Sequence, residues 1–119
     1  MEKVSIIEKL QLISDYWNPI IVGELNHQHV KLVKVKGDFL MHKHEREDEL
    51  FFVLKGKLNI DYGDHNKEIN EGEFIIVPKG TLHRPFSEKE THLLLFEPIS
   101  TLNTGNLHNE LTVDKPDIK

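Results

Sequence analysis

Short apolar runs, separated by polar or glycine-containing breaks, fill the chain between residues 19 and 98. Breaks such as Lys55-Gly56-Lys57 and Asn70-Glu71-Gly72 supply the residues that turns prefer. Short strands at intervals of about ten residues are typical of an antiparallel sandwich or barrel, so an all-β domain is predicted. The expected strands are residues 20–22, 30–35, 39–41, 50–54, 58–62, 67–69, 74–77 and 92–96.

The first 18 residues follow a helical spacing instead. Ser5 and Glu8 have the form of a capping box. Apolar residues then recur at helical intervals: Ile6, Leu10, Ile13 and Trp17. Because a proline disfavours helix at the residue before it, we expect a short helix that ends before Pro19. This segment is expected to pack on the chain's own barrel, with packing on a partner subunit as the alternative.

The residues after Pro98 are polar and typical of a loop. We expect residues 114–119 to be frayed, and the alternative is a tail that wraps onto a neighbouring subunit. A chain of 119 residues suits one domain. The expected organisation is therefore an N-terminal helical segment (residues 1–18), a barrel (residues 19–98) and a polar C-terminal tail (residues 99–119).

Composition narrows the class of protein. Hydrophobic residues make up 38% and charged residues 29% of the chain, which suits a soluble globular protein. The formal charge of −5 disfavours a nucleic-acid partner. We find neither an apolar stretch of the roughly 18 residues that span a membrane nor a basic segment that leads into an apolar one, so a cytoplasmic protein is expected. The chain has no cysteine, which excludes disulfides and thiolate metal sites.

Two stretches hold candidate metal ligands. His42 and His44 would lie on one face of an extended segment, and a turn would bring Glu49 near them. Two imidazoles and one carboxylate form a known set of ligands for a divalent metal. In the second stretch, the turn at residues 78–80 leads to His83, a candidate fourth ligand. The alternative is that the first stretch, the most polar of the chain, is a solvated surface.

Together the two stretches resemble the paired signatures of the cupin family. The first signature reads His42-x-His44, four residues, Glu49, six residues and Gly56. The second reads Gly72, five residues, Pro78-x-Gly80, two residues and His83. Two departures are that Gly37 stands one residue closer to His42 than is usual, and that Ser87 occupies a position where Asn is common.

The resemblance implies a double-stranded β-helix, or jelly-roll barrel, here with a short N-terminal helix. It also implies that one divalent transition metal is bound by His42, His44, Glu49 and His83. Such ligands accept Zn, Fe, Mn, Ni or Cu, and affinity order alone does not choose between them. Glu49 is preferred over the nearby Glu45 and Glu47 because it borders an apolar run and has the family's spacing. His27 and His29 repeat the H-x-H spacing but lack a following carboxylate within reach, so they are expected on the surface. The isolated histidines are expected to be structural or exposed: His65, His92 and His108.

Strand alternation predicts what surrounds the metal. Five residues share the parity of a ligand and are expected to line a mainly apolar pocket: Leu40, Phe51, Val53, Pro85 and Ser87. Plain barrel core is the alternative for the apolar members. Lys43 and Arg84 have the opposite parity and should point away. No general base other than Glu49 is evident near the motif.

Three functions are consistent with this sequence. The first is a metal-dependent enzyme acting on a small molecule, of the dioxygenase or isomerase type that the resemblance implies. The second is a non-catalytic module that binds or senses a small molecule, with or without metal. The third is a purely structural barrel. A homodimer is expected in each case because sheet edges are commonly covered by pairing.

Overall fold

The N-terminal helix begins where the capping box places it and ends early. In the computed structural model, which describes residues 1–119, helix α1 spans Ile6–Leu10, and the Glu8 N–H donates to the Ser5 side chain at 3.3 Å. Beyond the helix, the Trp17 N–H donates to the Lys34 carbonyl, and the Trp17 indole N–H donates to the Lys36 carbonyl. These bonds to the barrel hold the chain near Trp17 in a non-helical path, although the helical spacing continues to this residue.

Eight strands follow, and most lie where the sequence predicts them. Residues 39–41 are the exception, because they form a loop that leaves the sheet rather than a strand. The strands are β1 (Ile20–Leu25), β2 (Gln28–Asp38), β3 (Glu49–Lys55), β4 (Lys57–Asp61), β5 (Asn66–Asn70), β6 (Phe74–Val77), β7 (Arg84–Pro98) and β8 (Asp117–Ile118).

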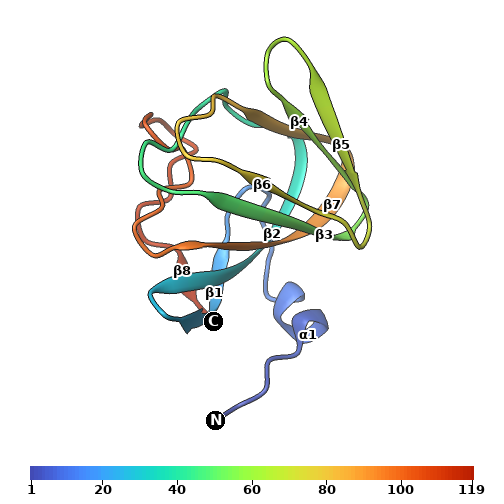
Figure 1. The fold of residues 1–119 in the computed structure, drawn as a ribbon. Coiled ribbons are helices and arrows are strands. Elements are labelled where there is room, and N and C mark those ends of the chain that lie inside the picture. Colours follow the sequence, from blue (N-terminus) through green and yellow to red (C-terminus); the bar gives the residue numbers. More distant parts are fainter.

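Strand β7 connects the two layers of the barrel. Residues 84–86 pair with β4, and residues 92–96 pair with β3. Strand β2 runs antiparallel along both parts of β7. The strand order is β5-β4-β7-β2-β1-β8, with β3 paired to both β6 and β7. The result is the all-β jelly roll seen in Figure 1, in which the β4–β5 hairpin lies across the barrel from β3 and β6.

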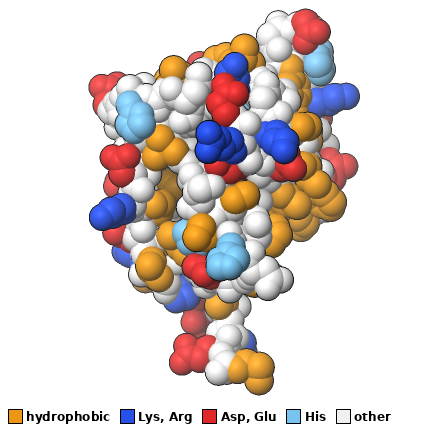
Figure 2. All heavy atoms as spheres, turned by 60° about the vertical axis from the view of Figure 1, so that its left-hand side comes forward, with side chains coloured by type: hydrophobic (Ala, Val, Ile, Leu, Met, Phe, Trp, Pro, Cys, Tyr) orange, Lys and Arg blue, Asp and Glu red, His pale blue; other side chains and the backbone are white.

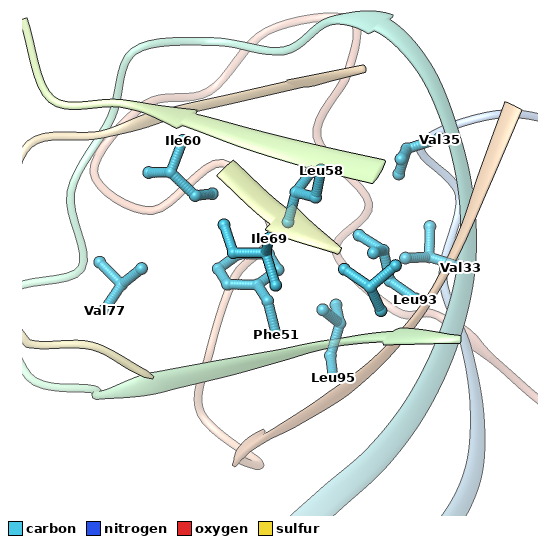
Figure 3. Packing of buried hydrophobic residues seen from close by; sticks show 10 residues of the cluster. Val33, Val35, Phe51, Leu58, Ile60, Ile69, Val77, Leu93 and Leu95 are labelled. Carbon is cyan, nitrogen blue, oxygen red and sulfur yellow. The ribbon is translucent and has the colours of Figure 1, made fainter. Parts of the chain in front are cut away.

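The apolar core fills the space between the layers. Its side chains converge from five strands and from the end of β6, as Figure 3 shows: Val33, Val35, Phe51, Val53, Leu58, Ile60, Ile69, Val77, Leu93 and Leu95. A smaller cluster on the outer side of the sheet joins Ile13 to Ile20 and Leu32, with Ile6 and Leu10 of the N-terminal segment packed against it. Helix α1 and Ile13 therefore cover an outer face of the sheet, whereas Trp17 packs against the inner core.

The end of the chain is ordered, contrary to our expectation. Strand β8 runs parallel to β1 and pairs Ile118 with Ile21. The Lys119 N–H then donates to the Ile21 carbonyl at 2.9 Å. Strand β1 has β2 on one side, so β8 covers an edge that would otherwise be unpaired. The prediction that residues 114–119 are frayed is wrong.

The surface gives no sign of a basic patch on the face shown in Figure 2, where Lys and Arg side chains are interspersed with Asp and Glu. The five-residue α1 is the only helix of the structure. No helix is long or apolar enough to cross a membrane.

Gly56 should be sensitive to substitution because of both its backbone and its surroundings. Gly56 and Gly63 have φ angles of 93° and 94°, which L side chains rarely adopt. A Cβ on Gly56 would lie 2.6 Å from the Thr91 hydroxyl, whereas a Cβ on Gly63 would meet nothing within 4 Å. We expect Gly63→Ala to lower the free energy of unfolding by about 1 kcal/mol and Gly56→Ala by about 2 kcal/mol or more. Urea unfolding measures both, and equal losses would contradict the clash.

Candidate metal centre

Backbone hydrogen bonds join the two segments that carry the candidate ligands. The His42 N–H donates to the His83 carbonyl, and the His83 N–H donates to the His42 carbonyl, both at 2.9 Å. The Gly80 N–H donates to the His44 carbonyl at 2.7 Å. Gly80 has a φ of 78° in the turn after β6, where a residue with a side chain would be strained. This pairing brings the loop after β2 against the turn before β7.

The four candidate ligands meet in the interior. Glu49 opens β3, and its Oε1 lies 3.3 Å from His44 Nε2 and 3.5 Å from His83 Nε2. The donor atoms of His42, His44, Glu49 and His83 all lie within 4.8 Å of one another. Metal bonds of about 2.1 Å place neighbouring donors about 3.0–3.4 Å apart and opposite donors about 4.2 Å apart. The distances from Glu49 to His44 and to His83 are close to the spacing of neighbouring donors, so this group could hold one metal ion.

Hydrogen bonding leaves the expected ring nitrogens free. His42 Nδ1 lies 2.8 Å from the Leu40 carbonyl, and His83 Nδ1 lies 2.9 Å from the Thr81 carbonyl. A proton on each Nδ1 would be donated to these oxygens, which leaves Nε2 as the metal-binding atom. His44 Nε2, His83 Nε2 and Glu49 Oε1 are buried without a hydrogen-bond partner. Buried polar atoms are rarely left so, and a bound metal would satisfy all three.

The protonation states also suit a metal. His42, His44, Glu49 and His83 are each at most 4% exposed. Burial lowers the pKa of His42 to about 4, so this ring is neutral at neutral pH, as a ligand must be. Burial alone would raise the pKa of Glu49, but contacts with His44 and His83 outweigh it and hold that pKa below its usual range.

Glu45 and Glu47, the two alternatives to Glu49 as the carboxylate ligand, are not part of this group. Glu45 is exposed and lies 3.2 Å from the Lys43 ammonium, and Glu47 accepts a hydrogen bond from Ser100. Arg84 binds Asp38 and Asp61 at the surface of the barrel, so it faces away from the centre as its parity indicates.

The five histidines outside the candidate metal centre differ in their exposure and contacts. Three are exposed: His27, His65 and His108. His92 is half-buried and bonds Glu90. His29 is also half-buried, and its Nδ1 lies buried without a partner, so it is less of a surface residue than its sequence context indicates.

A cavity of about 40 Å³ adjoins the ligands His42 and Glu49. Phe51 and Pro85 line it as the alternation predicts, but Leu40, Val53 and Ser87 do not. Leu40 lies in the loop outside β2, Val53 packs in the core, and Ser87 donates to the Lys57 carbonyl on the β4 side. Alternation along a strand predicts which face of the sheet a side chain lies on, but not how far along the barrel that side chain lies.

Residues from both ends of the chain complete the cavity. Trp17 and Pro19 contribute from the N-terminal side, and Asn103 contributes from the tail. Trp17 has a φ of 60°, rare for an aromatic residue, and stacks on Phe39 with ring centroids 4.8 Å apart. Phe39 in turn meets the edge of His42 at 5.5 Å. The two terminal segments thus form part of the centre's surroundings.

Glu97 is an acidic group that sequence reasoning missed. It lies on the inner face of β7, lines the cavity beside Glu49, and is only 2% exposed. Burial and the neighbouring Glu49 carboxylate raise the pKa of Glu97 well above its usual range, against the effect of Lys31. The alternation of β7 could have identified it, because Glu97 shares the parity of Leu93 and Leu95. Glu49 is therefore not the only acidic side chain at the centre, contrary to our expectation.

The fold and the site define a jelly-roll domain with a buried group of three histidines and one glutamate that could hold a metal ion. Residues 29–97 match the family model described as a cupin domain. The chain belongs to the cupin family, and the resemblance of its two sequence motifs is confirmed.

Similar proteins agree with this assignment. A cupin-2 domain protein of Shewanella frigidimarina is 36% identical, with a TM-score of 0.78 over 80% of this chain and 93% of its own. Protein NMB1881 of Neisseria meningitidis is 35% identical, with a TM-score of 0.75 over 82% of this chain and 99% of its own. The uncharacterized protein YdbB of Bacillus subtilis is 36% identical over 64% of this chain and 68% of its own length.

The lowered pKa of His42 predicts how pH affects the metal-free protein. The unfolded chain binds a proton on this ring near pH 6.5 and the folded protein near pH 4, so its contribution to stability is lost as pH falls between these values. Across that interval, we expect the free energy of unfolding to fall relative to that of His42→Gln by up to about 3 kcal/mol. The raised pKa of Glu97 acts in the opposite direction, but equally in both proteins. Chemical denaturation with chelator present measures the difference, and parallel pH profiles would contradict it.

Proposed function

We propose that this protein is a metal-dependent enzyme that acts on a small, largely uncharged molecule at the centre formed by His42, His44, Glu49 and His83. The observation that carries the proposal is the convergence of four buried donors, three of which have an atom without a hydrogen-bond partner. Three imidazoles and one carboxylate leave open positions on an octahedral ion. Zn, Fe, Mn, Ni and Cu all accept such ligands, and the bound metal would supply Lewis-acid or redox chemistry at those positions.

The lining and the volume of the cavity favour a small, largely uncharged substrate. Its walls are mainly apolar, with Val33, Val35, Phe51, Leu93 and Leu95 among them. Its volume of about 40 Å³ compares with roughly 10–15 Å³ for one water, so it admits a group of a few atoms. No Lys or Arg is among the residues that line it, and the buried Lys31 is paired with Glu97. These features favour dioxygenase-type chemistry on an uncharged group over isomerisation of a sugar phosphate, whose anion would need free cationic partners.

The alternative function is a non-catalytic module in which the same centre fixes or senses a small molecule. The same pocket serves both functions, and turnover separates them. We also propose that the protein is cytoplasmic and acts without nucleic acid or membrane, which its acidic charge favours.

The first prediction of this proposal is a metal content of about one equivalent. Protein purified without chelator or added metal should contain one transition-metal ion, and His42→Ala/His44→Ala should contain none because the variant loses two of four ligands. His65→Ala/His108→Ala, which removes two exposed imidazoles, is the matched control and should keep the metal. Elemental analysis gives the result. A metal-free parent that takes up no metal on titration would refute the metal centre.

Turnover then separates the two functions. An enzyme of the proposed type, loaded with Fe²⁺, should consume O₂ in the presence of small uncharged substrates and should leave sugar phosphates unchanged. Binding of such molecules without turnover by any metal-loaded form would favour the sensing module.

We further propose that two copies associate through the outer face of β3, β6 and β7. Strand β6 pairs only with β3, which leaves its other edge free. Phe74 and Ile76 of β6 are 58% and 53% exposed, and the register places Phe52 and Leu50 of β3 beside them. Exposed apolar faces of this kind commonly mark association surfaces.

Negative charges introduced on this face should prevent the two copies from associating. We expect the parent to sediment as a dimer and Phe74→Glu/Ile76→Glu as a monomer, because four carboxylates would be buried in the dimer. Lys67→Glu on β5 changes the net charge by the same −2 at an exposed site and should remain dimeric. Analytical ultracentrifugation tests this, and a monomeric parent at micromolar concentrations would exclude the proposal.

A further inference from the structure

The C-terminal tail contacts the segment that carries two of the candidate metal ligands. Lys43 lies between His42 and His44, and both of its backbone polar groups bind Asn106. The Asn106 N–H donates to the Lys43 carbonyl at 3.0 Å, and the Lys43 N–H donates to Asn106 Oδ1 at 3.2 Å. One tail residue therefore holds the backbone between the two ligands at two points.

The barrel holds the same segment from the other side. Both backbone polar groups of His42 bind His83, and the His44 carbonyl accepts from Gly80. In an extended segment, the backbone groups of successive residues point to opposite sides. The groups of Lys43 consequently point away from His83, where the barrel offers no partner and the tail supplies both hydrogen bonds.

Gly105 allows the tail to come this close. It has a φ of 60°, and a Cβ at this position would overlap the Lys43 carbonyl oxygen and lie 3.0 Å from His42 Cδ2. In the imidazole ring, Cδ2 is bonded to Nε2, the nitrogen of His42 that is left to bind a metal. The Gly105 backbone therefore packs beside the donor atom, and a side chain there would displace the ring or the tail.

The tail is held in place by polar contacts of its own. Thr104 is fully buried, and its hydroxyl donates to the Leu107 carbonyl at 2.6 Å. The Gly105 N–H donates to the Leu102 carbonyl at 2.8 Å. Neither apolar cluster of the structure contains a residue of the tail. The contacts of Gly105 and Asn106 can therefore be altered without removing a side chain from the core.

These contacts lie outside the region that matches the cupin model, which ends at residue 97. We propose that Gly105 and Asn106 are positioning residues of the metal centre. They fix the backbone at Lys43, and with it the orientation of the His42 and His44 rings. The inference rests on the proposed metal binding. Groups that orient metal ligands typically contribute roughly 10- to 100-fold to metal affinity.

The test measures the affinity for Co²⁺ in competition with a chelator, together with the visible absorption that reports the geometry of the Co²⁺ ligands. Asn106→Ala removes the acceptor of the Lys43 N–H, and we expect it to bind Co²⁺ roughly 10-fold more weakly with an altered spectrum. Gly105→Ala forces the tail or the His42 ring to move, and a loss of roughly 10- to 100-fold is expected. Asn106→Asp keeps an acceptor oxygen and should stay within about threefold of the parent.

Asn109→Ala is the matched control. The Asn109 side chain also accepts from a backbone N–H, that of Leu111 at 2.8 Å, and its hydrogen bonds all lie within the tail. This variant should bind Co²⁺ as the parent does, with the same spectrum, although its thermal midpoint falls about as far as that of Asn106→Ala. A purely structural role of the tail predicts instead that Co²⁺ affinity follows the thermal midpoint in both variants.

Three outcomes would contradict the inference, and they differ in their consequences for the metal centre. If the parent binds Co²⁺ and the folded Asn106→Ala and Gly105→Ala variants bind it as tightly with the same spectrum, the inference is overturned and the metal centre stands. Equal losses in Asn109→Ala and Asn106→Ala would also overturn it, because a general loosening of the tail would account for both. A parent that binds no Co²⁺ would overturn the inference and the proposed metal centre together. Asn106→Ala introduces no clash, so it decides the test even where Gly105→Ala does not fold.

Discussion

The reciprocal backbone hydrogen bonds between His42 and His83 determine the geometry of the whole centre. They bring the loop that follows β2 against the turn that precedes β7. The Gly80 N–H extends the same contact to the His44 carbonyl, and Glu49 enters from the start of β3. Because the donors are attached to backbone that is already paired, their spacing does not depend on a bound metal to gather flexible loops.

In this arrangement, most of the buried polar atoms that lack a hydrogen-bond partner lie at one end of the barrel. The core between β3, β4 and β5 is built from aliphatic side chains and Phe51, whereas the other end holds three imidazoles and two carboxylates. All seven buried side-chain atoms without a hydrogen-bond partner belong to six residues: His29, His44, Glu49, His83, Glu97 and Thr101. Five of these seven atoms belong to the candidate ligands His44, Glu49 and His83 or to Glu97 in the adjoining cavity. Such atoms destabilise a protein unless a ligand satisfies them, so their concentration at the candidate site supports a functional reading.

Segments near both ends of the chain border the cavity beside the candidate metal ligands. Trp17 and Pro19 border the cavity from one side and Asn103 borders it from the other. The tail also lies close to the ligand loop, because the Asn106 N–H donates to the Lys43 carbonyl and a Cβ on Gly105 would overlap that oxygen. Substrate access would therefore involve these terminal segments, while the metal ligands stay on the paired barrel backbone.

The sequence by itself determined the strand pattern, the fold class and the four candidate ligands, because short-range periodicity and motif spacing are local properties of the chain. It did not determine where Phe39 to Met41 leave the sheet, that Asp117 and Ile118 return to β1, or that Val53 and Ser87 lie away from the cavity. Each of these depends on which residues meet across strands distant in sequence. Glu97 is an example: the alternation along β7 indicates that it faces inward, but only the tertiary structure places it beside Lys31 and in the same cavity as Glu49, since the three residues come from different strands.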